Sequence, residues 1–232
     1  MGRRHRQGLI ATAAPAILAG MNYLAHGFRF VDRPYFLAGT AVPDWLSVCD
    51  RSLRIRAADV SACPTGAAGE ICSGIAQHLA DDEWFHSNPV FEDVCRQIAQ
   101  QMRREFPQPK NFRASFLAHV LTELILDNTL IEGNATLIDR YYDALSMVSD
   151  DEIEAAIAQF AGRVPDRLRS CLQRFRESQF LKHYGDDAQL LRRLSQVVQR
   201  AGLPALPADF DRTFPAARRL VAERAAELLP AV

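Results

Sequence analysis

Apolar and polar residues along most of this chain follow the 3.6-residue period of amphipathic α-helices. The longest such pattern runs from Asn111 to Glu132, with apolar residues at successive i, i+3 and i+4 positions. Sequence signals for helix starts support the same reading, since Asn88-Pro89 begins one helix and a capping box from Ser149 to Glu152 begins another. No segment alternates convincingly with the two-residue period of a strand, so the sequence predicts an all-α fold.

Proline, glycine and asparagine mark the breaks between the expected helices. After a short helix from Met21, helices are expected over residues 36–48 with an interruption at Pro43, 74–87, 89–106, 111–132, around Tyr141 and Tyr142, 150–162, 165–184, 186–201 and 215–229. Residues 57–69 are rich in small side chains and are expected to form a long exposed loop. Asp44 follows the proline interruption, so one interpretation makes it an ordinary first-turn acid that suits the helix dipole.

Residues 1–20 differ from the rest of the chain. Three arginines precede an Ala-rich apolar run that Pro15 interrupts, which resembles a weak signal peptide and leaves export as one alternative. Met21 opens a stronger helical pattern and is an alternative start. We therefore expect residues 1–20 to be a poorly ordered extension and residues 21–232 to form a single domain.

Composition and charge narrow the possible functions. The 232 residues include 27 basic and 28 acidic side chains, so the formal net charge is −1 and no nucleic-acid partner is expected. No run approaches the roughly 18 apolar residues of a membrane-spanning helix, so no membrane span is expected. The five cysteines are scattered without a C-x-x-C pair, which predicts free thiols and a cytoplasmic location.

The central stretch GIAQHLADDEWFHSNP, residues 74–89, carries the first candidate chemistry. His78, Asp82 and His86 are spaced four residues apart, which places them on one stripe of a helix. His119, Glu123 and Asp127 repeat with the same spacing beside the apolar face of a later helix. Buried polar side chains need partners, so these stripes are expected to meet other polar groups.

Two further segments, MNYLAH at residues 21–26 and AVPDW at residues 41–45, look able to complete a site with the helical stripes. The candidate residues are His26, Asp44, His78, Asp82, His86, His119 and Glu123. Mixed nitrogen and oxygen ligands suit manganese, iron or zinc better than magnesium or calcium. Such ions commonly activate water, so the set points to hydrolysis of a phosphoester. The alternative is that each histidine is a satisfied core residue, because His-x-x-x-Asp and His-x-x-x-Glu often arise by chance on helices.

Other catalytic chemistries have less support in the sequence. There is no Gly-rich phosphate loop and no G-x-S-x-G nucleophile motif. A Cys-His hydrolase stays open, although no cysteine is flanked by residues that would activate its thiol.

MNYLAH followed by LAGTAVPDW is similar to the opening of the acyl carrier protein phosphodiesterase family, divergent relatives of the HD-domain phosphohydrolases. That family has MNFLAH followed by LSGNLLADF, and the 18-residue separation of His26 and Asp44 matches it. Gly74-Ile75, His78 and Asp82 fit its second block. HVLTELIL resembles its third block, and FLKHYGDDAQLLRRL and DFDRTFPAARRL resemble its later helices, so the resemblance extends from Met21 to the end.

The chain departs from the family pattern at four positions. Ala76 and Leu124 stand where the family has histidines, His119 stands at an acid position, and His86 stands where an aspartate is expected. The departures keep the spacing of the site but change the identity of its ligands.

The resemblance implies an HD-domain-like helical bundle that removes 4′-phosphopantetheine from holo-acyl carrier protein, with manganese as its metal. His26, His78, Asp82, His119 and Glu123 are then candidate ligands. Asp44 is a ligand or orients the attacking water, and His86 is a general acid or a further ligand. Two alternatives are a related phosphohydrolase acting on a nucleotide or other small phosphoester, and a non-catalytic helical binding module.

An acidic carrier protein requires a basic docking face. The candidate strip comprises Arg163, Arg167, Arg169, Arg174, Arg176 and Lys182. The alternative is an ordinary solvated helix face.

Overall fold

The computed structural model describes residues 22–50, 52–53, 55–60, 65–107 and 113–230. Over these residues the chain forms α-helices and short 3-10 helices and no β-strand, which confirms the expected all-α fold. The expected extension at residues 1–20 lies outside the described residues.

The described chain contains ten α-helices. They are α1 (Tyr23–Gly27), α2 (Pro34–Cys49), α3 (Ala67–Ser87), α4 (Pro89–Glu105), α5 (Ala114–Gly133), α6 (Leu137–Ser146), α7 (Asp150–Ala161), α8 (Leu168–Ser178), α9 (Asp187–Arg200) and α10 (Phe214–Leu228). Four 3-10 helices cover Phe28–Phe30, Ala57–Val60, Phe180–His183 and Phe210–Thr213.

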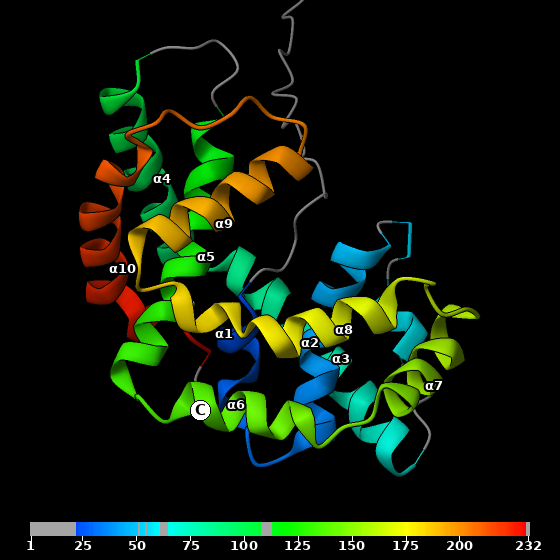
Figure 1. Ribbon diagram of the computed structural model, residues 1–232. Coiled ribbons are helices and arrows are strands. Elements are labelled where there is room, and N and C mark those ends of the chain that lie inside the picture. The colour runs from blue at the N-terminus through cyan, green and yellow to red at the C-terminus, as the bar shows by residue number, and fades with distance from the viewer. Residues whose placement is uncertain (1–21, 51, 54, 61–64, 108–112, 231–232) are drawn as a thin grey trace, which may run out of the picture.

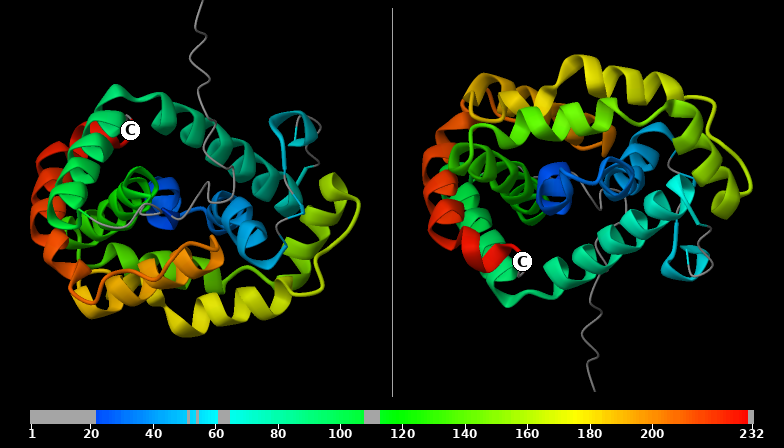
Figure 2. Two further views of the ribbon diagram at one scale, coloured as in Figure 1. Left: turned by 90° about the horizontal axis from the view of Figure 1, so that it is seen from above. Right: turned by 90° about the horizontal axis from the view of Figure 1, so that it is seen from below.

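The helices pack in two groups (Figure 1). Helices α4, α9 and α10 pack against α5, whereas α3, α6 and α8 pack against α2, and α1 contacts both α2 and α5. Views along the perpendicular direction show α1, α2 and α5 inside a ring formed by the other helices (Figure 2). Among the described helices, only α5 is long and apolar enough to cross a membrane, and most of it is buried inside the bundle.

Cap residues define many helix ends as the sequence predicts. The Asn88 side chain accepts a hydrogen bond from the Val90 amide at 2.9 Å, at the start of α4. The Ser149–Glu152 capping box begins α7, and Gly162 ends that helix in the left-handed conformation. These local signals were readable because cap residues satisfy backbone groups within a few positions of themselves.

The structure corrects the expected break at Pro43. Helix α2 continues through this proline, so Asp44 lies inside a helix and is fully buried rather than being a first-turn acid. A proline removes one backbone donor, but packing of the buried residues around it can keep the rest of a helix intact.

Two other expected element boundaries are wrong. The expected helix over residues 165–184 ends at Ser178, because Gln179 adopts a left-handed φ of 42° before the 3-10 helix. The expected loop over residues 57–69 contains a 3-10 helix with buried Val60, and α3 begins before the expected loop ends.

The expectation that all cysteines are free thiols is wrong for Cys72, which is disulfide-bonded. Cys49, Cys95 and Cys171 are free thiols.

Helices α2 and α3 cross at two glycines. A Cβ at Gly39 would lie 2.1 Å from the carbonyl oxygen of Ile71, and one at Gly74 would lie 2.0 Å from that of Phe36. Only glycine permits such close approach of two backbones. The crossing places α2 directly against the α3 face that carries His78, one helical turn after Gly74.

Candidate metal centre

Four helices bring the seven candidate residues into one region of the bundle. Helix α1 supplies His26, α2 supplies Asp44, α3 supplies the His78, Asp82 and His86 stripe, and α5 supplies the His119 and Glu123 pair. Contacts and charge interactions described below link all seven. The structure therefore brings these distant segments side by side, and the roles of their side chains are the subject of the proposal below.

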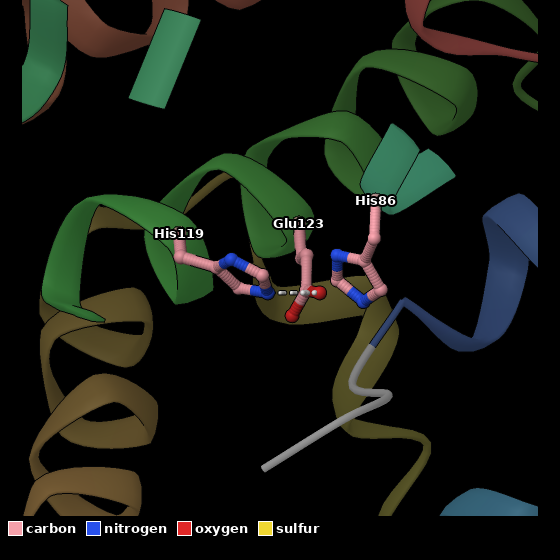
Figure 3. A group of neighbouring side chains, drawn as sticks. All are labelled: His86, His119 and Glu123. Carbon is pink, nitrogen blue, oxygen red and sulfur yellow. Dashed lines mark ion pairs between the residues drawn. The ribbon is translucent and has the colours of Figure 1, made fainter. Parts of the chain in front are cut away.

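The most compact group joins the end of α3 to the middle of α5 (Figure 3). One potential ligand atom from each of His86, His119 and Glu123 lies within 4.8 Å of the others. Glu123 Oε1 is 3.1 Å from His119 Nε2, and the rings of His86 and His119 are stacked with centroids 4.9 Å apart. Each histidine side chain is 31% exposed and the Glu123 side chain 1%, so the group is open to solvent on its histidine side.

His86 also forms a pair with Asp82, one turn earlier on α3. Its Nε2 is 3.0 Å from Asp82 Oδ1. The hydrogen bond and the negative charge of Asp82 raise the pKa of His86 against the opposing effect of burial. Burial by itself raises the pKa of Asp82, but the hydrogen bond and positive charge of His86 outweigh it, and the pKa is lowered. The pair thus favours an ionised carboxylate beside a protonated imidazole.

The other two histidines form a buried pair at the opposite end of the cluster. The rings of His26 and His78 lie 4.0 Å apart, and His78 Nδ1 donates to the Thr40 carbonyl oxygen at 2.7 Å. Burial and then the neighbouring His26 lower the pKa of His78 to about 3, so its ring is neutral. A neutral imidazole whose Nδ1 is bonded to a carbonyl keeps Nε2 available as a metal ligand.

Asp44 is the most unusual residue of the cluster. Both of its carboxylate oxygens are buried without a hydrogen-bond partner among the described residues. Burial raises its pKa well above the usual range, and the negative charges of Glu123 and Asp82 raise it further. Within the same described residues, Glu123 Oε2 and His26 Nε2 are also buried without a hydrogen-bond partner.

This pattern fits a bound cation. A buried carboxylate is costly unless it is paired or coordinates a metal. The orphaned atoms come from two carboxylates and one imidazole, which are oxygen and nitrogen ligands of the kinds that manganese, iron and zinc accept. The residues present therefore fit a divalent metal.

Asp127 is a residue of the site to which sequence reasoning assigned no role. Its Oδ1 accepts a hydrogen bond from the Ala25 amide at 2.8 Å, and its Oδ2 accepts one from the Leu24 amide at 3.2 Å. Helix α1 has no side-chain cap from its own Asn22, so a carboxylate from α5 caps it instead. The cap fixes the short helix that carries His26. The four-residue spacing from Glu123 indicates that Asp127 lies on the same face of the helix, but it does not predict the contact with the α1 amides.

Asp81 was missed as well, because it looks like an ordinary acid beside Asp82. Its Oδ2 lies 3.9 Å from His26 Nδ1 and is paired with Arg29, and its Oδ1 accepts from Gln77 at 2.8 Å. Burial raises its pKa, but the favourable interactions with His26 and Arg29 outweigh burial and lower the pKa overall. Asp81 therefore places a negative charge beside the Nδ1 side of His26.

The expected basic strip is largely neutralised within the chain. Arg163 pairs with Asp50, Arg169 with Asp151 and Glu154, Arg176 with Asp150, and Lys182 with Asp139. The other two members, Arg167 and Arg174, line a cavity. These side chains do not form the continuous uncompensated face that the sequence suggested.

Comparisons with known proteins add no family to this geometry. No protein-family model, curated protein or solved structure matches the chain.

Proposed function

We propose that this protein is a metal-dependent phosphodiesterase whose divalent ion is held by the cluster at the centre of the bundle. The observation that carries the proposal is Asp44, a fully buried carboxylate with both oxygens lacking a hydrogen-bond partner among the described residues. After burial, the negative charges of Glu123 and Asp82 raise its pKa further, and a bound cation would offset this buried negative charge.

We assign the seven side chains either as metal ligands or as groups that transfer protons or orient water. His26, His78, Asp82, His119 and Glu123 are the proposed ligands, and Asp44 is a ligand or orients the attacking water. A divalent metal here supplies Lewis acidity, which activates water and offsets charge on phosphoryl oxygens. Manganese is favoured by the family resemblance, with iron or zinc as alternatives that the same donor set accepts.

His86 is proposed as the general acid, with a role as a further ligand as the alternative. It is partly exposed, and Asp82 holds its imidazole at 3.0 Å and favours its protonated form. A positioned, protonated imidazole can deliver a proton to the oxygen of the leaving group. Asp82 would then both orient His86 and contribute its second oxygen to the metal.

Replacing His86 with glutamine is expected to lower kcat by about 10²- to 10⁴-fold, the usual range for loss of a general acid. Metal content should stay unchanged if His86 is an acid rather than a ligand. The matched control is His183→Gln, which alters an exposed histidine of the 3-10 helix and should leave kcat unchanged. Loss of metal in His86→Gln would assign it to the ligand set instead.

The substrate proposed from the resemblance is holo-acyl carrier protein, from which the 4′-phosphopantetheine phosphodiester would be hydrolysed to leave the apo-protein. The altered ligand identities favour testing a second candidate, a nucleotide or other small phosphoester. Turnover of holo-carrier protein beside a nucleotide panel distinguishes the two. A helical binding module without catalysis would turn over neither and would hold no stoichiometric metal.

The deciding measurement is elemental analysis of the protein and its Asp82→Ala variant, both purified without a metal-affinity column. We expect about one or two equivalents of manganese, iron or zinc in the protein and loss of metal and turnover in the variant. Circular dichroism should show unchanged helicity, because Asp82 lies on the α3 face toward the site and not in the apolar core. Equal metal content in both proteins would contradict the proposed ligand set.

A further inference from the structure

A second concave site lies between α2, α8 and α9. Helices α8 and α9 cross the face of the molecule turned to the viewer in Figure 1. It is a cavity of about 1150 Å³. Small-molecule sites commonly enclose about 300–1,000 Å³, so this cavity is large enough for a ligand of ordinary metabolite size. None of the seven candidate metal-site residues lines it, as far as the described chain defines its walls.

The inner wall of the cavity is aromatic. Tyr23, Trp45, Phe175 and Phe180 line it, and the rings of Tyr23 and Trp45 pack against Phe175 with centroids 4.8 and 5.5 Å apart. The indole nitrogen of Trp45 is buried without a hydrogen-bond partner among the described residues. Such a wall offers a rigid surface for the apolar body of a ligand.

The rim of the same cavity is basic. Arg167 and Arg174 come from the start and middle of α8, and Arg193 and Arg200 come from α9. Each pair is spaced seven residues apart, which places both members on the same side of their helix, two turns apart.

Acidic side chains offset this charge only in part. Asp50 and Glu177 also line the cavity, and Asp50 is already paired with Arg163 at 2.7 Å. In a chain with a net charge of −1, Arg167, Arg174 and Arg193 around one hollow are a local concentration of positive charge.

Arg193 joins the two walls. Its guanidinium lies 3.8 Å from the ring centroid of Phe180, which holds the planar group in place by cation–π stacking. Its Nε is buried without a hydrogen-bond partner in the described chain. A neighbouring cavity of about 450 Å³ shares Arg193 and Phe180 and adds Arg192 to the basic lining. Stacked arginine forks match the geometry of phosphate oxygens better than a flexible lysine does.

We propose that this cavity binds an organic phosphate, with the phosphate held by the arginines and an apolar or aromatic body against the Tyr23 and Trp45 wall. The site is distinct from the metal centre because none of the seven candidate residues lines it, although Arg193 lies close enough to lower the pKa of Asp44. It does not depend on the proposed hydrolase activity.

Tryptophan fluorescence gives a direct test, because Trp45 is in the cavity wall and the other tryptophan, Trp84, is on α3. The Trp84→Phe protein reports Trp45 alone. It is titrated with three ligands. ADP carries both an aromatic base and a phosphate group, pyrophosphate represents the anionic part alone, and adenosine represents the aromatic part alone. We expect saturable quenching by ADP, at least tenfold weaker binding of pyrophosphate, and no saturation by adenosine.

Arginine variants then locate the bound phosphate. In the same background, Arg174→Ala and Arg193→Ala should each weaken ADP binding about tenfold or more, since each removes a charge-assisted hydrogen-bond donor. The matched control is Arg219→Ala, an exposed arginine of α10 outside the cavity, which should leave binding unchanged. Thermal unfolding confirms that each variant is folded.

A further variant separates the cavity from the metal centre. ADP binding should persist in the Asp82→Ala protein, whereas phosphate bound at the metal would be lost there. Saturation by adenosine as tight as by ADP, absence of ADP binding, or equal binding in the arginine variants and the control would each overturn the proposal. Loss of ADP binding in Asp82→Ala would also overturn it and would place the phosphate at the metal centre.

Discussion

The Gly74→Ala variant is expected to lose about 3 kcal/mol of unfolding free energy, because the added methyl group meets a backbone carbonyl rather than a side chain that can turn away. Its Cβ would lie 2.0 Å from the Phe36 oxygen, so α2 and α3 must move apart. For a chain of this length the loss corresponds to a fall of about 10 °C in Tm. Differential scanning calorimetry measures it.

Separation of the two helices should also weaken metal binding at the proposed metal centre. The hydrogen bond from His78 to the Thr40 carbonyl spans this crossing at 2.7 Å and orients the imidazole. Loss of a hydrogen bond that orients a ligand typically weakens metal affinity about 10- to 100-fold. Titration with manganese should therefore show weaker binding in Gly74→Ala even under conditions where the variant is fully folded.

Gly133→Ala is the matched control for this substitution. Gly133 is the last residue of α5, and its added methyl group would meet nothing within 4 Å. Alanine favours helix over glycine by up to about 1 kcal/mol, so this variant should be as stable as the parent or slightly more stable. A Gly74→Ala protein as stable as Gly133→Ala would show that the crossing is looser than described.

Asp44→Asn is expected to change the free energy of unfolding, and the sign of the change depends on whether metal is bound. Without metal the variant should be more stable than the parent at neutral pH by about 1 kcal/mol or more, because it removes a buried carboxylate that has no hydrogen-bond partner among the described residues. With metal the order should reverse, since a bound ion stabilises the parent through this carboxylate. Urea unfolding with and without EDTA measures both differences.

The pH dependence follows from the raised pKa of Asp44, which burial and then the charge of Glu123 cause. A folded-state pKa above the unfolded value of about 3.9 means that folding favours the protonated form. The free energy of unfolding of the metal-free parent protein should therefore fall as pH rises above about 4. Asp44→Asn has no titrating group at this position, so this contribution to the fall is missing in the variant. The stability difference between the two proteins should grow with pH.

Asp127→Asn is the control that separates an unpartnered carboxylate from a partnered one. Asp127 is also fully buried, but its two oxygens accept the Leu24 and Ala25 amides. An asparagine keeps only one acceptor oxygen, so this variant should be destabilised by about 1–3 kcal/mol with or without metal. Stabilisation of both variants in EDTA would mean that general charge repulsion, rather than the missing partners of Asp44, governs the cluster.

The sequence was most informative where the cause of a structure is local. Asn88 and the Ser149–Glu152 box satisfy backbone groups of their own helices, so their positions could be read directly. The four-residue spacing of His78, Asp82 and His86 likewise required only a helix. The continuation of α2 through Pro43 could not be read, because packing by other helices decides it.

In the candidate site, too, local contacts could be predicted from the sequence and long-range contacts could not. Side-chain contacts within one helix, such as that of His119 with Glu123, follow from spacing alone. The cap that Asp127 places on α1 joins residues more than one hundred positions apart, and no local pattern encodes such a contact. Gln179 gave no signal either, since a left-handed φ is expected at glycine rather than glutamine.

The cap from Asp127 also sets when the centre can assemble during synthesis. A ribosome delivers the chain from its N-terminus at about 5–20 residues per second, so the segment with His26 emerges several seconds before its partner on α5. Until Asp127 arrives, the five-residue helix α1 is far shorter than a helix that is stable alone. If the centre holds a metal as proposed, loading belongs to a late stage, and nascent chains that end before α5 should retain no ion.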